Sequence, residues 1–71
     1  MLVYDRLWAT MKEKGVSTYT LREEYGFDTR TIRRLRGNQN VTADTLSRLC
    51  RILSCRLEDI AEYRPEPEEK L

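Results

Sequence analysis

The chain is short, and its charges are nearly balanced: 71 residues include 13 Lys and Arg, 12 Asp and Glu and no His, for a formal charge of +1. A chain of this length forms one modest core, because small domains bury only about 60% of the surface that the unfolded chain exposes. The apolar runs fall short of the roughly 18 residues of a membrane span, and the N-terminus has no secretory pattern, so we expect one soluble, cytoplasmic domain without a membrane partner.

Apolar residues recur every three or four positions, and this period predicts helices rather than strands. The first helix is expected from about residue 4 to residue 14, ending at Gly15. Its buried stripe is Tyr4, Leu7, Trp8 and Met11. Ser17 is the expected N-cap of a second short helix, which runs to Gly26.

Three further helices follow in the pattern. Asp28 is the expected N-cap of a third helix that Gly37 ends, and Thr42 is the expected N-cap of a fourth. The inner stripe of the fourth helix is Leu46, Leu49, Cys50 and Leu53. A fifth helix is expected at about residues 56–63. Its inward residues are Leu57, Ile60 and Tyr63. The sequence therefore predicts an all-α fold of five short helices.

The charges are unevenly distributed along the chain. Residues 1–57 hold eleven basic and six acidic side chains, a net charge of +5, whereas residues 58–71 hold two and six, a net charge of −4. Two prolines and alternating acids in the last eight residues predict a flexible segment. We therefore expect one domain at residues 1–63, followed by an acidic tail at residues 64–71.

The residue types also exclude several kinds of site. Cys50 and Cys55 cannot complete a tetrahedral zinc site within a chain that has no His. We expect reduced thiols that pack or lie at the surface, with Cys50 packing as a small apolar residue, and a redox or disulfide role is the alternative. The chain has no His, no glycine-rich phosphate loop and no pairing of a nucleophile with a base, so the sequence predicts no enzyme and no cofactor.

The third helix carries a cluster of basic side chains. At about 100° per residue, Arg30, Arg33 and Arg34 share an arc of about 100°, opposite the two large apolar residues of the helix. The N-cap Asp28 is the only acid of the segment, so no acid three or four residues away within the helix neutralises the arginines. This surface either grips a nucleic acid or is a solvated face that the helix dipole favours.

A short helix, a tight turn and a helix surround this cluster. Leu21 precedes Gly26 by five residues, Ile32 follows that glycine by six, and Leu35 follows it by nine. This spacing resembles the helix-turn-helix of the lambda repressor/Cro (XRE) family, which here spans about residues 18–37. The resemblance implies a lambda repressor-like DNA-binding fold.

The resemblance extends beyond the motif. Residues 41–63 look like the family's fourth and fifth helices, so the similarity covers about residues 4–63. Three positions depart from the family pattern. Arg22 stands where the family often has alanine, and Thr18 stands where many members have a glutamine that contacts a backbone phosphate. Before the glycine that ends the third helix, the family commonly has an acid and one further residue, and here Arg36 alone fills that stretch. Because the segment is one residue short at this end, we expect the following loop to have its own geometry.

By this resemblance, the third helix is a recognition helix that lies in the major groove of double-stranded DNA. The residues implied to meet base edges are Thr29, Arg30 and Arg34. The residues implied to contact phosphates are Thr18, Tyr19, Arg33, Asn38 and Asn40. Arginine matches the paired acceptors of guanine, and the start of the second helix offers N–H groups to a phosphate. For the two asparagines, a simple turn role is the alternative.

The resemblance implies a sequence-specific transcriptional regulator, a bacterial or phage-type repressor that binds its operator as a homodimer. Leu2 and Val3, or the outer face of the fifth helix, are candidate dimer surfaces. An antitoxin-like or accessory module that holds a protein through its acidic C-terminal end is the alternative from another class. RNA binding is less favoured, because the arginines lie on a compact helix face rather than beside stacking aromatic side chains.

Overall fold

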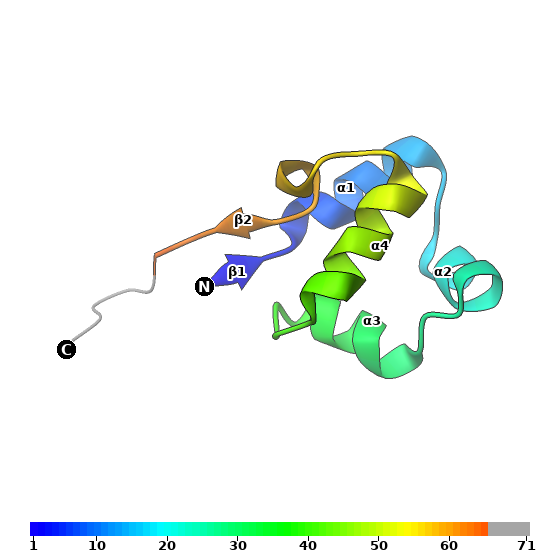
Figure 1. Cartoon of the computed structure of the whole chain (residues 1–71), viewed down its shortest axis with the longest axis horizontal. Helices are drawn as coiled ribbons and strands as arrows, with labels where there is room; N and C mark the ends of the chain where they lie inside the picture. The colour runs from blue at the N-terminus through cyan, green and yellow to red at the C-terminus, as the bar shows by residue number, and fades with distance from the viewer. Residues whose placement is uncertain (66–71) are drawn as a thin grey trace.

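The computed structural model describes residues 1–65 as four α-helices, one turn of 3₁₀-helix and a two-stranded antiparallel sheet (Figure 1). In chain order these are β1 Leu2–Val3, α1 Asp5–Lys14, α2 Thr18–Tyr25, α3 Thr29–Arg36, α4 Ala43–Leu53, η1 Leu57–Asp59 and β2 Glu62–Tyr63. In Figure 1, α4 crosses the middle of the molecule, and the sheet lies at the opposite end from α2. The prediction of a small domain built from short helices is confirmed, but the predicted all-α fold of five helices lacked the two-stranded sheet.

Three of the helices begin at the capping residues that the sequence predicts. Each cap side chain accepts a hydrogen bond from the backbone N–H three residues further on: Ser17 at 3.1 Å, Asp28 at 2.8 Å and Thr42 at 3.1 Å. Each bond satisfies an N–H group that has no partner within its own helix. Helix α1 begins at Asp5, and it ends at Gly15 in the left-handed conformation, with φ of 72°.

One apolar core joins the helices. Its buried members are Tyr4, Leu7, Met11, Leu21, Phe27, Ile32, Leu35, Leu49, Leu53, Ile60 and Ala61. Burial of one such leucine contributes about 1.5–3 kcal/mol, so this cluster is the main stabilising feature of a chain with four short helices. Burial also raises the pKa of Tyr4 above its usual value. Trp8 and Cys50 are partly buried against the edge of the cluster.

The predicted fifth helix is wrong. Residues 57–59 form only one 3₁₀ turn, in which the Asp59 carboxylate accepts the N–H of Arg56 at 2.9 Å. The chain then becomes extended, because Glu62–Tyr63 pairs antiparallel with Leu2–Val3. A helix that continued to residue 63 would lose this pairing. Because the partner segment lies some 60 residues away in the sequence, no local pattern reveals the pairing.

This change of backbone alters which apolar residues face the core. Ile60 is buried as predicted, but Leu57 is 53% exposed and Tyr63 is 65% exposed. Leu57 and Ile60 would share a face of a continuous α-helix, whereas a single turn followed by a strand points them apart. Val3, a candidate for an exposed dimer surface, is instead buried.

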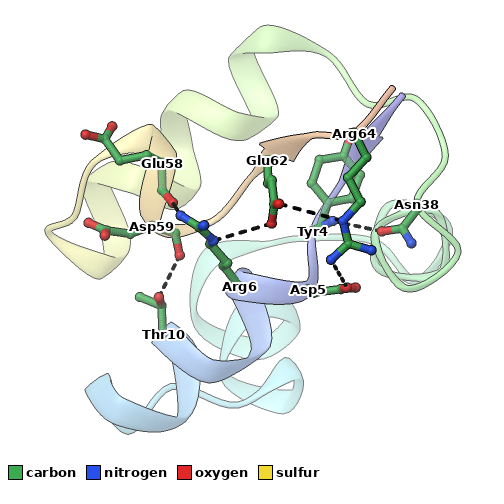
Figure 2. Close-up of polar contacts among 9 residues, drawn as sticks. All are labelled: Tyr4, Asp5, Arg6, Thr10, Asn38, Glu58, Asp59, Glu62 and Arg64. Carbon is green, nitrogen blue, oxygen red and sulfur yellow. Dashed lines mark hydrogen bonds and ion pairs between the residues drawn. The ribbon is translucent and has the colours of Figure 1, made fainter. Parts of the chain in front are cut away.

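Polar contacts fasten the sheet to the start of α1 (Figure 2). Arg64 and Met1 exchange two backbone hydrogen bonds, at 2.6 and 2.8 Å, which extend the pairing of the two strands. Arg6 lies 3.5 Å from the Glu62 carboxylate, and Arg64 lies 3.3 Å from that of Asp5.

The predicted boundary between domain and tail at residue 63 stays a prediction, since residues 66–71 lie outside the described part. Within residues 1–65, no helix has both the length and the apolar character that crossing a membrane requires.

Candidate nucleic-acid interface

Helices α2 and α3 are joined by a tight turn. Gly26 has φ of 73°, a left-handed conformation in which a side chain is strained, and the N–H of Phe27 donates to the Leu21 carbonyl at 3.0 Å. Phe27 is buried and Asp28 caps α3 directly afterwards. The turn glycine and the cap therefore fix the angle at which α3 leaves α2. Arg22, which replaces the family's frequent alanine, is exposed.

Arg48 of α4 holds this turn from the other side. Its guanidinium donates to the Tyr25 carbonyl at 2.6 Å, and its Cζ atom lies 4.4 Å from the centroid of the Phe27 ring. A cation over an aromatic face is attracted by the ring quadrupole. Arg48 therefore connects α4 to the turn between α2 and α3, and its guanidinium stabilises that turn.

The outer face of α3 is basic and carries no acidic partner. Arg30 and Arg33 are exposed, and Arg34 is partly buried. Among residues 1–65, the ion pairs join Arg6 to Glu62, Arg56 to Glu58 and Arg64 to both Asp5 and Glu62, so none of them involves α3. None of these ion pairs uses an arginine of α3, so the exposed Arg30 and Arg33 remain available to an external anion.

The acid at the start of α3 is held in its charged form. Hydrogen bonds from the Thr31 side chain and backbone N–H lower the pKa of Asp28, with a weaker contribution from the positive charge of Arg30. The carboxylate also sits at the N-terminal end of the helix, where a negative charge is favoured. Asp28 therefore serves as a cap, while the arginines that follow it point outward.

Arg36, at the C-terminal end of α3, contacts an aromatic side chain of α1. Its Cζ atom lies 5.1 Å from the centroid of the Trp8 ring, which is partly buried on α1. This contact links the end of α3 to α1, while the Arg36 side chain stays exposed.

The loop after α3 turns at Asn38 rather than at the glycine before it. Gly37 has φ of −92°, and the left-handed residue is Asn38, with φ of 54°. The Asn38 side-chain oxygen accepts the N–H of Tyr4 at 2.8 Å (Figure 2). Asn38 thus has a structural role, and its predicted contact with a phosphate stays a prediction for its NH₂ group.

The same loop returns to Arg34. The Gln39 N–H donates to the Arg34 carbonyl at 2.8 Å, and Nη1 of Arg34 donates to the Asn40 carbonyl at 3.3 Å. An open hollow of about 410 Å³ lies here, between α3 and the start of α4. It is lined by Arg30, Thr31, Arg34, Asn40, Val41, Thr42 and Thr45. Three of the residues predicted to contact DNA, Arg30, Arg34 and Asn40, therefore meet at one concave surface.

Comparison with known proteins agrees with this arrangement. A family model of the Cro/C1-type HTH DNA-binding domain matches residues 6–66. The chain belongs to this family. The crystal structure of the transcriptional regulator VanUg (form II) superposes with a TM-score of 0.82 at 32% sequence identity, covering 92% of this chain and 87% of that one. The comparison with curated proteins gave no match.

In this Cro/C1-type domain, α2 and α3 form the helix-turn-helix, and the suspected lambda repressor/Cro resemblance is confirmed. Thr18 and Tyr19 lie in the first turn of α2, outside the hollow, and Tyr19 is exposed. Arg33 and Thr29 are exposed on α3 and also lie outside it. The hollow therefore gathers Arg30, Arg34 and Asn40, whereas Thr29 and Arg33 lie elsewhere on α3, Asn38 lies in the following loop, and Thr18 and Tyr19 lie at the start of α2.

Sequence reasoning assigned no DNA contact to Thr42 and Thr45, which line the same hollow. Thr42 was identified only as an N-cap, and its hydroxyl lies 3.0 Å from that of Thr45. The signal was present, because a capped helix N-terminus directs N–H groups outward and favours anions. In residues 1–65, no group of three or more His, Cys, Asp or Glu side chains is placed to hold a metal ion.

Proposed function

We propose that this Cro/C1-type domain is a sequence-specific transcriptional regulator that reads the major groove of double-stranded DNA with α3. The observation that carries the proposal is the outward face of α3, where Arg30 and Arg33 are exposed and no acid of the described chain pairs with them. An unneutralised basic face on a helix of this diameter suits the major groove, which is wide enough to admit an α-helix.

The proposal divides the contacts by chemistry. Thr29, Arg30 and Arg34 meet base edges, and the two arginines match the O6 and N7 acceptors of guanine. The backbone phosphates are met by Thr18, Tyr19, Arg33, Asn38 and Asn40. Phosphate contacts set the position of the domain on the duplex, and the base contacts supply the sequence preference.

The proposed regulator acts as a homodimer and represses by occupying its operator. One α3 contacts only a few base pairs, and two copies on half-sites about one helical turn apart give the affinity that one copy lacks. A regulator of bacterial type meets its DNA in the cytoplasm. The rival function, a protein-binding module that uses the acidic end, is less favoured. The described acids of that end are engaged within the chain, since Glu62 lies near Arg6 and Asp59 accepts the Arg56 N–H.

Selection from random duplex DNA tests this function. The purified chain is mixed with a fluorescent pool of random duplexes, binding is followed by anisotropy across a salt series, and the bound fraction is sequenced. We expect an enriched motif with two-fold symmetry and an affinity that falls steeply as salt rises, because bound phosphates release counterions. The absence of binding at about 50 mM salt, where phosphate contacts are strong, would contradict the function and direct attention to a protein partner.

A further inference from the structure

The two cysteines of the chain meet at the C-terminal end of α4. Ser54 ends this helix in the left-handed conformation, with φ of 50°. Two hydrogen bonds close the turn: the Cys55 N–H donates to the Cys50 carbonyl at 3.0 Å, and the Ser54 N–H donates to the Arg51 carbonyl at 3.3 Å. This pair of bonds forms a Schellman motif, in which the side chains at the positions of Cys50 and Cys55 frequently contact each other.

The two thiols are close enough to influence one another. Both are free, and both are partly buried against the edge of the core. Burial raises the pKa of the Cys55 thiol, and the charge of the Cys50 sulfur, the charge of Asp59 and a hydrogen bond with the Cys50 side chain add to this shift. A disulfide needs Cβ atoms about 3.5–4.5 Å apart, and two thiols in hydrogen-bond contact across a closed turn need little backbone movement to meet this condition.

Cys50 is the more accessible of the two sulfurs to a small molecule. It lines an open hollow of about 270 Å³, and Cys55 does not. The other residues that line this hollow are Ala43, Leu46, Ser47 and Leu57. None of them is charged, so the hollow suits a small neutral reagent better than an anion. Since a water molecule occupies about 30 Å³ in the liquid, hydrogen peroxide has ample room to reach the Cys50 sulfur.

We propose that Cys50 and Cys55 form a peroxide-reactive pair, in which Cys50 is oxidised first and Cys55 then closes a disulfide within the chain. In the first step the Cys50 thiolate attacks one peroxide oxygen and the O–O bond breaks. The other oxygen leaves as hydroxide and takes up the thiol proton to give water, and Cys50 becomes a sulfenic acid. In the second step the Cys55 sulfur attacks the Cys50 sulfur, the S–O bond breaks, and the oxygen leaves as water with the Cys55 proton. Two thiols have then lost two electrons, and one peroxide has become two waters.

The surroundings favour this order of events. The turn at Ser54 holds Cys55 beside Cys50, so the second step is intramolecular and has a high effective concentration. The raised pKa of Cys55 leaves little thiolate on that residue at neutral pH, which suits the second step better than the first attack. Neither cysteine lines the hollow beside α3, so the pair is separate from the proposed DNA contacts.

Mass spectrometry of the full chain without DNA tests the pair. The folded chain receives the dose of hydrogen peroxide that oxidises the urea-unfolded chain, and its remaining thiols are then blocked with iodoacetamide. We expect the intact mass, measured without reductant, to be the mass of one chain less two hydrogen atoms. Trypsin cleaves after Arg48, Arg51 and Arg56, which places the two cysteines in separate peptides. We therefore expect residues 49–51 to be joined to residues 52–56 until a thiol reductant is added.

Two single variants test the order of the steps. Cys55→Ser leaves Cys50 without its partner, so we expect a sulfenic acid that dimedone traps at Cys50. Cys50→Ser removes the accessible thiol, so we expect Cys55 to stay largely reduced under the same dose. Equal oxidation of the two variants would overturn the assignment of Cys50 as the first thiol. A folded wild type that keeps both thiols, or whose product has the mass of two chains, would overturn the pair itself.

The melting temperature of the oxidised chain tests the geometry. A disulfide that fits the native turn restricts mainly the unfolded chain, so the oxidised wild type should melt a few degrees above the reduced one. A lower melting temperature after oxidation would show that the turn must distort to form the bond, and it would contradict the proposed pairing.

Discussion

Arg30 and Arg36 offer the sharpest test of which arginines of α3 read DNA, because the two side chains lie on one helix and have different surroundings. Arg30 is exposed at the hollow beside α3, whereas Arg36 lies over the Trp8 ring at 5.1 Å. A lost bidentate contact to guanine costs about 1–3 kcal/mol, so Arg30→Ala is expected to weaken binding to a selected operator about 5- to 150-fold. Arg36→Ala removes the same charge but only a ring contact, worth about 0.5–1 kcal/mol of folding stability.

The two variants should therefore fail in different assays. Anisotropy at fixed salt measures affinity for the selected operator and for a scrambled duplex, and urea unfolding followed by Trp8 fluorescence measures stability. We expect Arg30→Ala to lose preference for the operator at unchanged stability. We expect Arg36→Ala to keep that preference and unfold at a lower urea midpoint. Equal loss of preference in both variants would show that only net charge matters and would refute the assignment of separate roles.

Three further predictions follow from named contacts. Arg48→Met keeps the apolar stem but loses the hydrogen bond to the Tyr25 carbonyl and the contact with the Phe27 ring. Urea titrations should show a free energy of unfolding lower by about 1–2 kcal/mol. A change within about 0.5 kcal/mol would contradict a stabilising role for these two contacts. Asn38→Ala leaves the N–H of Tyr4 without its acceptor and puts alanine in a left-handed conformation. Calorimetry should therefore find a free energy of unfolding lower by about 1–3 kcal/mol. An unchanged melting temperature would refute the structural role of Asn38. Because the folded state lowers the pKa of Asp28 from 3.8, its stabilisation is present above that pH and is lost as the pH falls through the lowered value. Asn at this position still caps the helix but does not titrate, so Asp28→Asn should melt below the wild type at neutral pH. This difference in melting temperature should shrink on acidification below pH 3.8. A difference that is independent of pH would count against the charged cap.

The helix-turn-helix was predictable from sequence because its determinants are local. Ser17, Asp28 and Thr42 each bond an N–H only three residues away, so the residue type and its place before an apolar pattern predict each start. The left-handed glycine between α2 and α3 acts in the same way. The basic face of α3 also follows from helical spacing alone.

The parts that sequence reasoning missed depend on contacts between distant segments. Whether residues 60–63 continue a helix is decided by β1 at the other end of the chain, and Leu57 is exposed as a consequence. The role of Arg36 depends on Trp8 of another helix, and that of Arg48 on the α2–α3 turn. Neither partner stands at helical spacing from its arginine, so periodicity cannot reveal it.

Amide chemical shifts would show whether α3 contacts the DNA. The ¹⁵N-labelled chain is titrated with its selected duplex, and shift changes are mapped on the described residues. We expect the largest changes at Thr29, Arg30 and Arg34 and at the start of α2, with small changes at Glu58–Tyr63. Changes confined to Glu58–Tyr63, with α3 unaffected, would contradict this contact.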